Sequence, residues 1–169
     1  FAPTSTEAQL AALGELAQQY SDVFIQTHLS ENLDEIAWVK SLFPQADGYL
    51  DVYDKYNLVR ERAVFGHGIH LTPDEWGRLG ESGATVAFCP TSNLFLGSGL
   101  FDMTAARANK VHVAMATDVG AGTTFNMFKT YGDAYKVSQL RNDPLSPLEG
   151  FYLMTQGAAI AHGLDEEIG

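Results

Sequence analysis

The chain has 169 residues, of which 46% are hydrophobic and 18% charged, a composition that supplies a globular core and excludes a disordered chain. Its formal net charge of −11 at pH 7 opposes binding to nucleic acid and to anionic membranes, so we expect neither as a partner. No apolar run is long enough to cross a membrane, and the single cysteine, Cys89, excludes an internal disulfide, so we expect a cytoplasmic protein.

The first part of the chain alternates amphipathic helices with short apolar strands. Thr4 and Glu7 match a capping box, which predicts a helix that runs to about residue 19. Pro44 marks the end of a later helix. The elements predicted next are a strand at 23–28, a helix at 33–42 and a helical stretch at 49–59.

The second part continues the same alternation. Thr72 is a predicted cap, with Pro73 in the first helical turn, for a helix that ends near Gly83. Ser92 and Asn93 lie in a predicted glycine-rich loop, and Ser146 caps the last helical segment. The remaining predicted elements are strands at 63–69, 85–88 and 112–117 and helices at 102–109 and 126–140.

Strands that alternate with helices predict a parallel sheet with right-handed crossovers, and therefore an α/β fold. Two architectures fit: an open doubly wound sheet, or part of a (β/α)₈ barrel, which needs roughly 250 residues. Because the pattern contains half the strands of a barrel, we predict about strands five to eight of a TIM-type barrel. Residues 1–169 would then form a single partial domain, the C-terminal half of the barrel, cut between strands four and five.

Polar side chains lie where each predicted strand ends. His28 and His67 end the first two strands, residues 89–93 follow the third, and Asp118 follows the fourth. In parallel α/β folds these ends meet at one edge, where active sites are built. Glu31 follows His28 closely enough to face the same pocket.

Each of these residues also has a structural interpretation when it is taken alone. A single histidine is often a satisfied structural residue, and Asp118 could cap a helix. Glu31 could stabilise the N-terminus of the next helix, and Asn93 could fix its own loop. A structural role is harder to assign to all four strand ends together, so the set predicts a functional site.

Four motifs, in chain order, resemble the amidohydrolase superfamily in its cyclic-amidine deaminase branch. They are His-Leu-Ser-Glu at 28–31, Gly-His-Gly at 66–68, Cys-Pro-Thr-Ser-Asn at 89–93 and Thr-Asp at 117–118. The strings at 28–32, 52–55 and 118–122 resemble the guanine deaminases within that branch. The resemblance covers nearly the whole chain.

The resemblance implies one divalent metal ion, zinc or sometimes iron, with His28 and Asp118 among its ligands. The family's other two ligands, the histidines of an H-x-H motif, would lie upstream. The implied reaction is the hydrolysis of guanine to xanthine and ammonia by a metal-activated water. Glu31, His67 and Asp118 would be its catalytic residues.

The implied partner is a small purine, bound by Phe1, His28, Glu31, Asn93 and Asp118, and the implied full-length protein is a homodimer. With only two metal ligands, this chain by itself is expected to be inactive. Two alternatives stay open at this point. One is another amidohydrolase that acts on an adenosine derivative or a triazine, and the other is a metal-free α/β domain that binds a small molecule.

Overall fold

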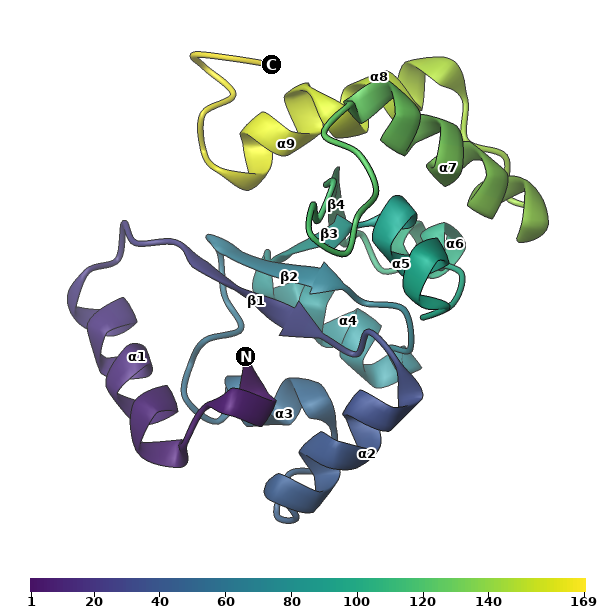
Figure 1. The fold of residues 1–169 in the computed structure, drawn as a ribbon. Coiled ribbons are helices and arrows are strands. Elements are labelled where there is room, and N and C mark those ends of the chain that lie inside the picture. Colours follow the sequence, from purple (N-terminus) through teal and green to yellow (C-terminus); the bar gives the residue numbers. More distant parts are fainter.

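The computed structural model describes residues 1–169 and contains one four-stranded parallel sheet (Figure 1). Its strands lie in chain order, each paired with the next, and are β1 (Ile25–Leu29), β2 (Ala63–His67), β3 (Thr85–Phe88) and β4 (His112–Met115). The register places Leu29 opposite His67, so the carboxyl ends of β1 and β2 lie together. The predicted parallel α/β class is confirmed.

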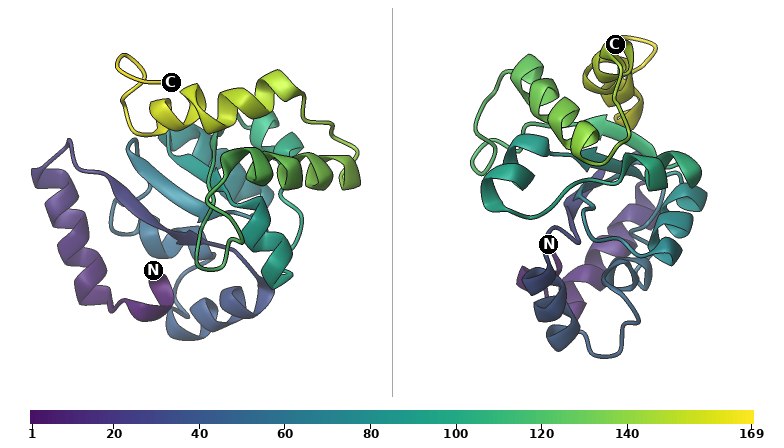
Figure 2. Two further views of the ribbon diagram at one scale, coloured as in Figure 1. Left: turned by 45° about the horizontal axis from the view of Figure 1, so that its top comes forward. Right: turned by 90° about the vertical axis from the view of Figure 1, so that its right-hand side faces the viewer.

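Helices follow every strand, and they also lie beside both edge strands of the sheet. Helices α1, α2 and α3 lie on the β1 side of the molecule, and α8 and α9 pack against β4 (Figures 1 and 2). None of the helices combines the length and the apolar composition needed to cross a bilayer. After a 3-10 turn at Ala2–Thr4, the helices are α1 (Glu7–Gln19), α2 (Leu33–Leu42), α3 (Tyr49–Asp54), α4 (Pro73–Ser82), α5 (Pro90–Leu96), α6 (Met103–Ala108), α7 (Met127–Leu140), α8 (Pro147–Met154) and α9 (Gln156–Ala161).

The two faces of the sheet differ in what they bury. A core of 29 buried hydrophobic residues includes Phe65 of β2 and Val86 of β3. The neighbouring strand positions Val64 and Ala87, with Cys89, form a separate cluster of 3 residues. Because side chains alternate across a strand, the two clusters lie on opposite faces. The large core therefore lies under the helices, and the opposite face carries His28 of β1 beside the small residues Gly66 and Ala87.

The first helix begins later than predicted. Thr6, not Thr4, caps α1, because its hydroxyl accepts a hydrogen bond from the N–H of Gln9 at 3.2 Å. Thr4 lies in the 3-10 turn, where its hydroxyl donates to the carbonyl of Phe1 at 3.1 Å. Thr4 with Glu7 and Thr6 with Gln9 fit the same capping pattern, so the pattern alone could not separate them.

Several other bounds differ from the predictions for local reasons. The start of the predicted glycine-rich loop is helix α5, which has Pro90 in its first turn and Gly97 as a left-handed C-cap with φ 71°. The stretch predicted at 49–59 is helical only to Asp54, and Asn57 beyond it is left-handed with φ 57°. The last helical segment divides at Thr155 into α8 and α9.

Candidate active site

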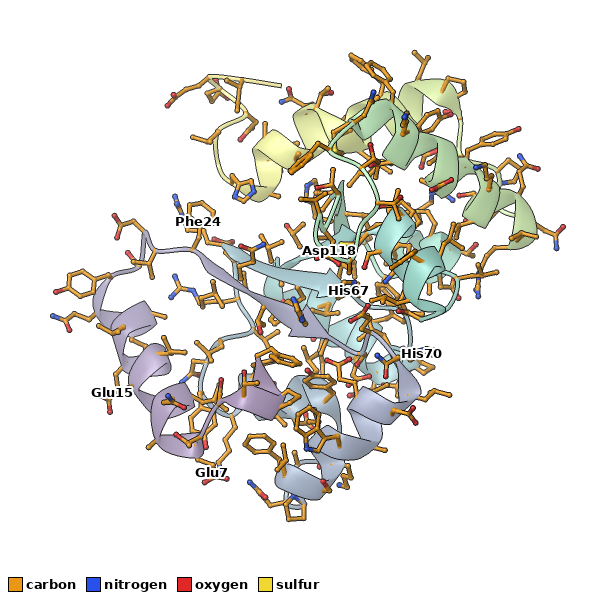
Figure 3. The ribbon with its side chains drawn as sticks, in the orientation of Figure 1. Glu7, Glu15, Phe24, His67, His70 and Asp118 are labelled. Atoms are coloured by element: carbon orange, nitrogen blue, oxygen red, sulfur yellow. The ribbon has the colours of Figure 1, made fainter.

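The strand ends come together around one cavity of about 570 Å³. Its lining includes His28 of β1, His67 of β2, Cys89 after β3 and Asp118 beyond β4. His67 and Asp118 lie near each other at this edge of the sheet (Figure 3). Phe1 lines the same cavity. The structure therefore brings His28, His67 and Asp118 together, as the strand pattern predicts, and places Phe1 beside them.

The cavity exists because its floor is made of small residues. Gly66, Ala87 and Ala116 line it between the polar side chains. They belong to the face of the sheet opposite the large core, so space is left above them. The volume lies within the range of ~300–1,000 Å³ that is usual for small-molecule sites.

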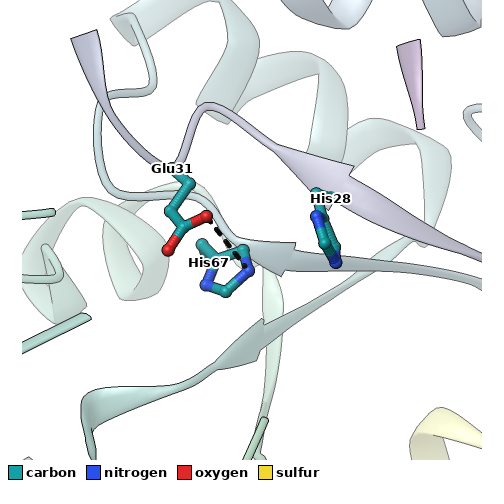
Figure 4. Close-up of side chains that lie close together, drawn as sticks. All are labelled: His28, Glu31 and His67. Atoms are coloured by element: carbon teal, nitrogen blue, oxygen red, sulfur yellow. Dashed lines mark ion pairs between the residues drawn. The ribbon is translucent and has the colours of Figure 1, made fainter. Parts of the chain in front are cut away.

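His67 lies at the centre of the polar cluster and is 2% exposed. Its Nε2 atom lies 3.7 Å from Oε2 of Glu31 (Figure 4). The same atom lies 4.0 Å from Oδ2 of Asp118. The side-chain N–H of Asn93 donates to Nδ1 of His67 at 3.0 Å, so the neutral ring carries its proton on Nε2. Burial lowers the pKa of His67 and outweighs the opposite effect of the two carboxylates.

Hydrogen bonds hold both the backbone and the side chain of Glu31 in place. Its backbone N–H donates to Oε2 of Glu35 at 2.8 Å, and the hydroxyl of Ser98 donates to its Oε1 at 3.0 Å. Sequence reasoning assigned a role to neither partner. The pair Asn32 and Glu35 matches a capping box, which the structure contains, so Glu35 had a local signal. Ser98 had none.

His28 stands between two other rings and opens to the cavity. Its ring centroid lies 5.1 Å from that of Phe1 and 5.1 Å from that of His67. The hydroxyl of the buried Tyr53 donates to the carbonyl of His28 at 2.9 Å and accepts from the N–H of Ala2 at 3.0 Å. Tyr53 therefore ties the segment that carries Phe1 to the strand that carries His28.

The loop after β4 positions Asp118 by a close backbone approach. Asp118 adopts a left-handed backbone with φ 48°, and its carbonyl accepts a hydrogen bond from the N–H of Gly122 at 2.6 Å. A Cβ atom at residue 122 would lie 1.7 Å from the carbonyl oxygen of Thr117. Only glycine fits this position without moving the backbone on either side of Asp118.

Three groups with metal-binding atoms lie close together. The side-chain ligand atoms of His28, Glu31 and His67 all lie within 4.8 Å of one another (Figure 4). Asp118 adjoins the same cluster, because its Oδ2 lies 4.0 Å from Nε2 of His67. Imidazole nitrogens and carboxylate oxygens form a donor set that suits zinc.

Asn93 and Cys89 are both buried next to the cavity, and only Cys89 lines it. Asn93 is 1% exposed and lies behind His67, outside the cavity lining. Cys89 is 3% exposed, and burial raises the pKa of its thiol to about 12. A thiol that stays protonated at neutral pH is a poor metal ligand. His70 and His112 lie outside the cavity lining, and their Nε2 atoms bond to the carbonyls of Ser98 and Gly157.

The whole chain, residues 1–169, matches the Amidohydrolase family. It is 56% identical over 169 residues to the guanine deaminase of Escherichia coli (strain K12), a match that covers 100% of this chain and 38% of that protein. The structure of E. coli guanine deaminase superposes with a TM-score of 0.98 and 56% identity, and the match covers 100% of this chain and 40% of that one.

Two further solved structures are similar. Guanine deaminase from C. acetobutylicum, with guanine bound in its active site, has a TM-score of 0.92 and 32% identity, over 100% of this chain and 41% of that one. An adenosine deaminase from Xanthomonas campestris with bound zinc has a TM-score of 0.89 and 29% identity, over 98% of this chain and 38% of that one.

These matches decide between the two predicted architectures. The sheet and its helices match amidohydrolase barrels rather than an open doubly wound sheet, and the chain spans only 38% of the length of the E. coli relative. The family match extends from the first residue to the last and includes every side chain around the cavity. The chain therefore belongs to the amidohydrolase family.

Proposed function

We propose that the full-length protein that carries this chain hydrolyses guanine to xanthine and ammonia. In this proposal residues 1–169 supply strands five to eight of the barrel, its C-terminal half. The observation that carries the proposal is the convergence of His28, His67 and Asp118 at one cavity, in a chain 56% identical to a guanine deaminase. Glu31 lies just outside the cavity lining, with its Oε2 3.7 Å from Nε2 of His67. A similar chain from C. acetobutylicum has guanine bound in its active site.

We assign one zinc ion to this site, with His28 and Asp118 as ligands. His67 is unsuited to the metal through Nε2, because Asn93 donates to its Nδ1 and leaves the proton on Nε2. His28 opens to the cavity, and Asp118 lines it. The remaining ligands are expected from the part of the barrel outside this chain, since catalytic zinc usually has three protein ligands. When bound, zinc lowers the pKa of a coordinated water to near 7 and so supplies the nucleophile.

The other residues supply proton transfer and orientation. Asp118 takes a proton from the attacking water, and Glu31 gives a proton to a ring nitrogen as the attacked carbon becomes tetrahedral. The Nε2–H of His67 donates a hydrogen bond to the attacking oxygen. Asp118 then passes its proton to the exocyclic nitrogen, the bond from the carbon to that nitrogen breaks, and ammonia leaves, while the remaining hydroxyl proton returns to Glu31 as the carbonyl forms. Phe1 flanks the purine beside His28, and Asn93 fixes the orientation of His67 rather than touching the substrate.

A second substrate class is tested alongside guanine, because the Xanthomonas campestris adenosine deaminase shares 29% identity with this chain. The full-length protein, loaded with zinc, is assayed for ammonia release from guanine, adenosine and an aminotriazine. We expect the highest kcat/KM with guanine. No ammonia from guanine, or a higher kcat/KM with either other substrate, would contradict the proposal.

Replacing Gly122 by alanine is expected to lower kcat/KM by about 10²-fold, because a small misplacement of a catalytic group has an effect of this size. The new Cβ would lie 1.7 Å from the Thr117 carbonyl and 2.9 Å from the Asp118 carbonyl, so the loop must shift. The measurement is steady-state kinetics of the full-length protein together with its zinc content.

Gly132→Ala is the matched control for this change. Gly132 lies within α7 and its added Cβ would meet nothing within 4 Å. Because alanine is a better helix former than glycine, this variant should keep full activity and gain up to about 1 kcal/mol of stability. Equal activity of the two variants would show that the close approach at Gly122 does not position Asp118.

A further inference from the structure

We propose that Ser98 is a positioning residue for Glu31, and that it leaves Oε2 as the oxygen that carries the proton. This inference rests on the proposed function. The Ser98 hydroxyl donates to Oε1 of Glu31 at 3.0 Å, and Ser98 itself is 5% exposed. The hydroxyl of Ser98 is hydrogen-bonded to Glu31, so we place its effect on that carboxylate.

Every polar group of Ser98 is bonded, which fixes the direction of its hydroxyl. Its backbone N–H donates to the carbonyl of Asn93 at 2.9 Å, and its carbonyl accepts from Nε2 of His70 at 2.7 Å. A carboxylate can only accept, so the hydroxyl proton points to Glu31. The serine is thus anchored from two sides and presents one donor to one oxygen.

The neighbouring turn leaves Ser98 little room to move. Gly99 has φ 137°, and a Cβ there would lie 2.7 Å from Cγ2 of Ile69. The backbone after Ser98 therefore packs directly on the segment that follows β2. A donor held this way orients a carboxylate more firmly than a mobile surface serine or a water would.

The two oxygens of Glu31 are consequently different. Oε1 is engaged by Ser98, whereas Oε2 lies 3.7 Å from Nε2 of His67, at the polar cluster. A hydrogen bond to Oε1 fixes the orientation of the carboxylate plane. It thereby directs Oε2 toward the purine ring that receives the proton. Loss of the bond lets the carboxylate rotate, so proton transfer slows while substrate and metal contacts stay in place.

One short segment, which contains Asn93 and Ser98, orients two catalytic groups. Asn93 bonds to Nδ1 of His67, and Ser98 bonds to Glu31. The two supporting residues are joined by the backbone hydrogen bond between them. Helix α5 and its C-terminal turn thus set the relative position of His67 and Glu31.

The test is Ser98→Ala in the zinc-loaded full-length protein. We expect kcat with guanine to fall about 10- to 100-fold, the range for a lost hydrogen bond to a charged group, with KM and zinc content unchanged. Ser92→Ala is the matched control, because Ser92 is a buried serine of α5 whose hydroxyl has no hydrogen-bond partner. It should keep the kcat of the wild-type protein.

A double-mutant cycle then separates positioning from a general effect on the fold. In the Glu31→Gln background, Ser98→Ala should lower kcat no further, because its effect passes through the Glu31 carboxylate. Full additivity of the two changes, or a wild-type kcat for Ser98→Ala, overturns the proposal. If Ser98→Ala does not fold, Ser98→Cys replaces it as a similar-sized residue with a weak donor, and an unchanged kcat there overturns the proposal equally.

A crystal structure of the Ser98→Ala protein tests the role of Ser98 independently of any activity with guanine. A wild-type protein that releases no ammonia from guanine would end the proposed function, and the crystal structure would still test Ser98. Rotation of the Glu31 carboxylate away from its wild-type position supports the positioning role. A carboxylate that stays in place overturns it.

Discussion

The Glu31→Gln variant of the full-length protein is expected to bind zinc normally and to lose about 10²- to 10⁴-fold in kcat, the usual contribution of a general acid–base group. Glutamine keeps the shape of the side chain and can still accept the hydrogen bond from Ser98. It cannot carry the proton that the ring nitrogen requires. Steady-state kinetics with guanine and a metal analysis of the purified protein measure the two parts of the prediction.

Asp34→Asn is the control for loss of one negative charge. Asp34 lies in the first turn of α2, close to Glu31 in sequence, and is exposed. Its replacement should leave kcat within about twofold of the wild-type value, since exposed charges contribute little. A Glu31→Gln protein as active as this control would refute the acid–base role of Glu31.

Replacing either predicted metal ligand, as His28→Ala or Asp118→Ala, is expected to abolish turnover and to weaken zinc binding by more than about 10²-fold. The reason for the magnitude is that residues which merely support metal ligands already contribute 10- to 100-fold to affinity. Zinc content after dialysis and titration with a competing chelator measure the loss. This result would distinguish the two residues from Glu31, whose replacement leaves the metal bound.

His162→Ala serves as the control for removal of an imidazole. His162 lies outside the cavity, and its ring packs 5.6 Å from that of Phe24. This variant should bind zinc as the wild type does. Full zinc content in Asp118→Ala would mean that the metal is held by the cluster of His28, Glu31 and His67 instead.

Local patterns predicted the parts of this molecule that depend on neighbouring residues. Strand β3 and helix α2 were predicted with their observed bounds, because an apolar run and an apolar helical face are read directly from the sequence. His28, His67 and Asp118 were identified because strand ends meet at one edge of a parallel sheet, a rule that requires only the position of each strand.

The hydrogen bonds that orient the catalytic side chains could not be predicted in the same way. Ser98 bonds to a residue 67 positions away, and Asn93 bonds to one 26 positions away. Neither contact leaves a periodic or capping signal. Ser98 therefore received no role and Asn93 was assigned to the substrate, whereas the structure places Asn93 behind His67. Such contacts follow from the closeness of β2, β3 and their loops in space, which sequence spacing does not encode.

The small residues of the cavity floor allow the volume of the cavity to change without strain in the strands that surround it. A Cβ at Gly66 would lie 3.6 Å from the carbonyl of Thr27 and 3.7 Å from Cδ2 of His28, which are ordinary contact distances. An added methyl group there takes up space in the cavity without forcing the strands apart. In the proposed function, single substitutions at such positions would therefore change the size of the ring that the cavity admits. The strands and the proton-transfer groups would stay in place when the size of the cavity changes.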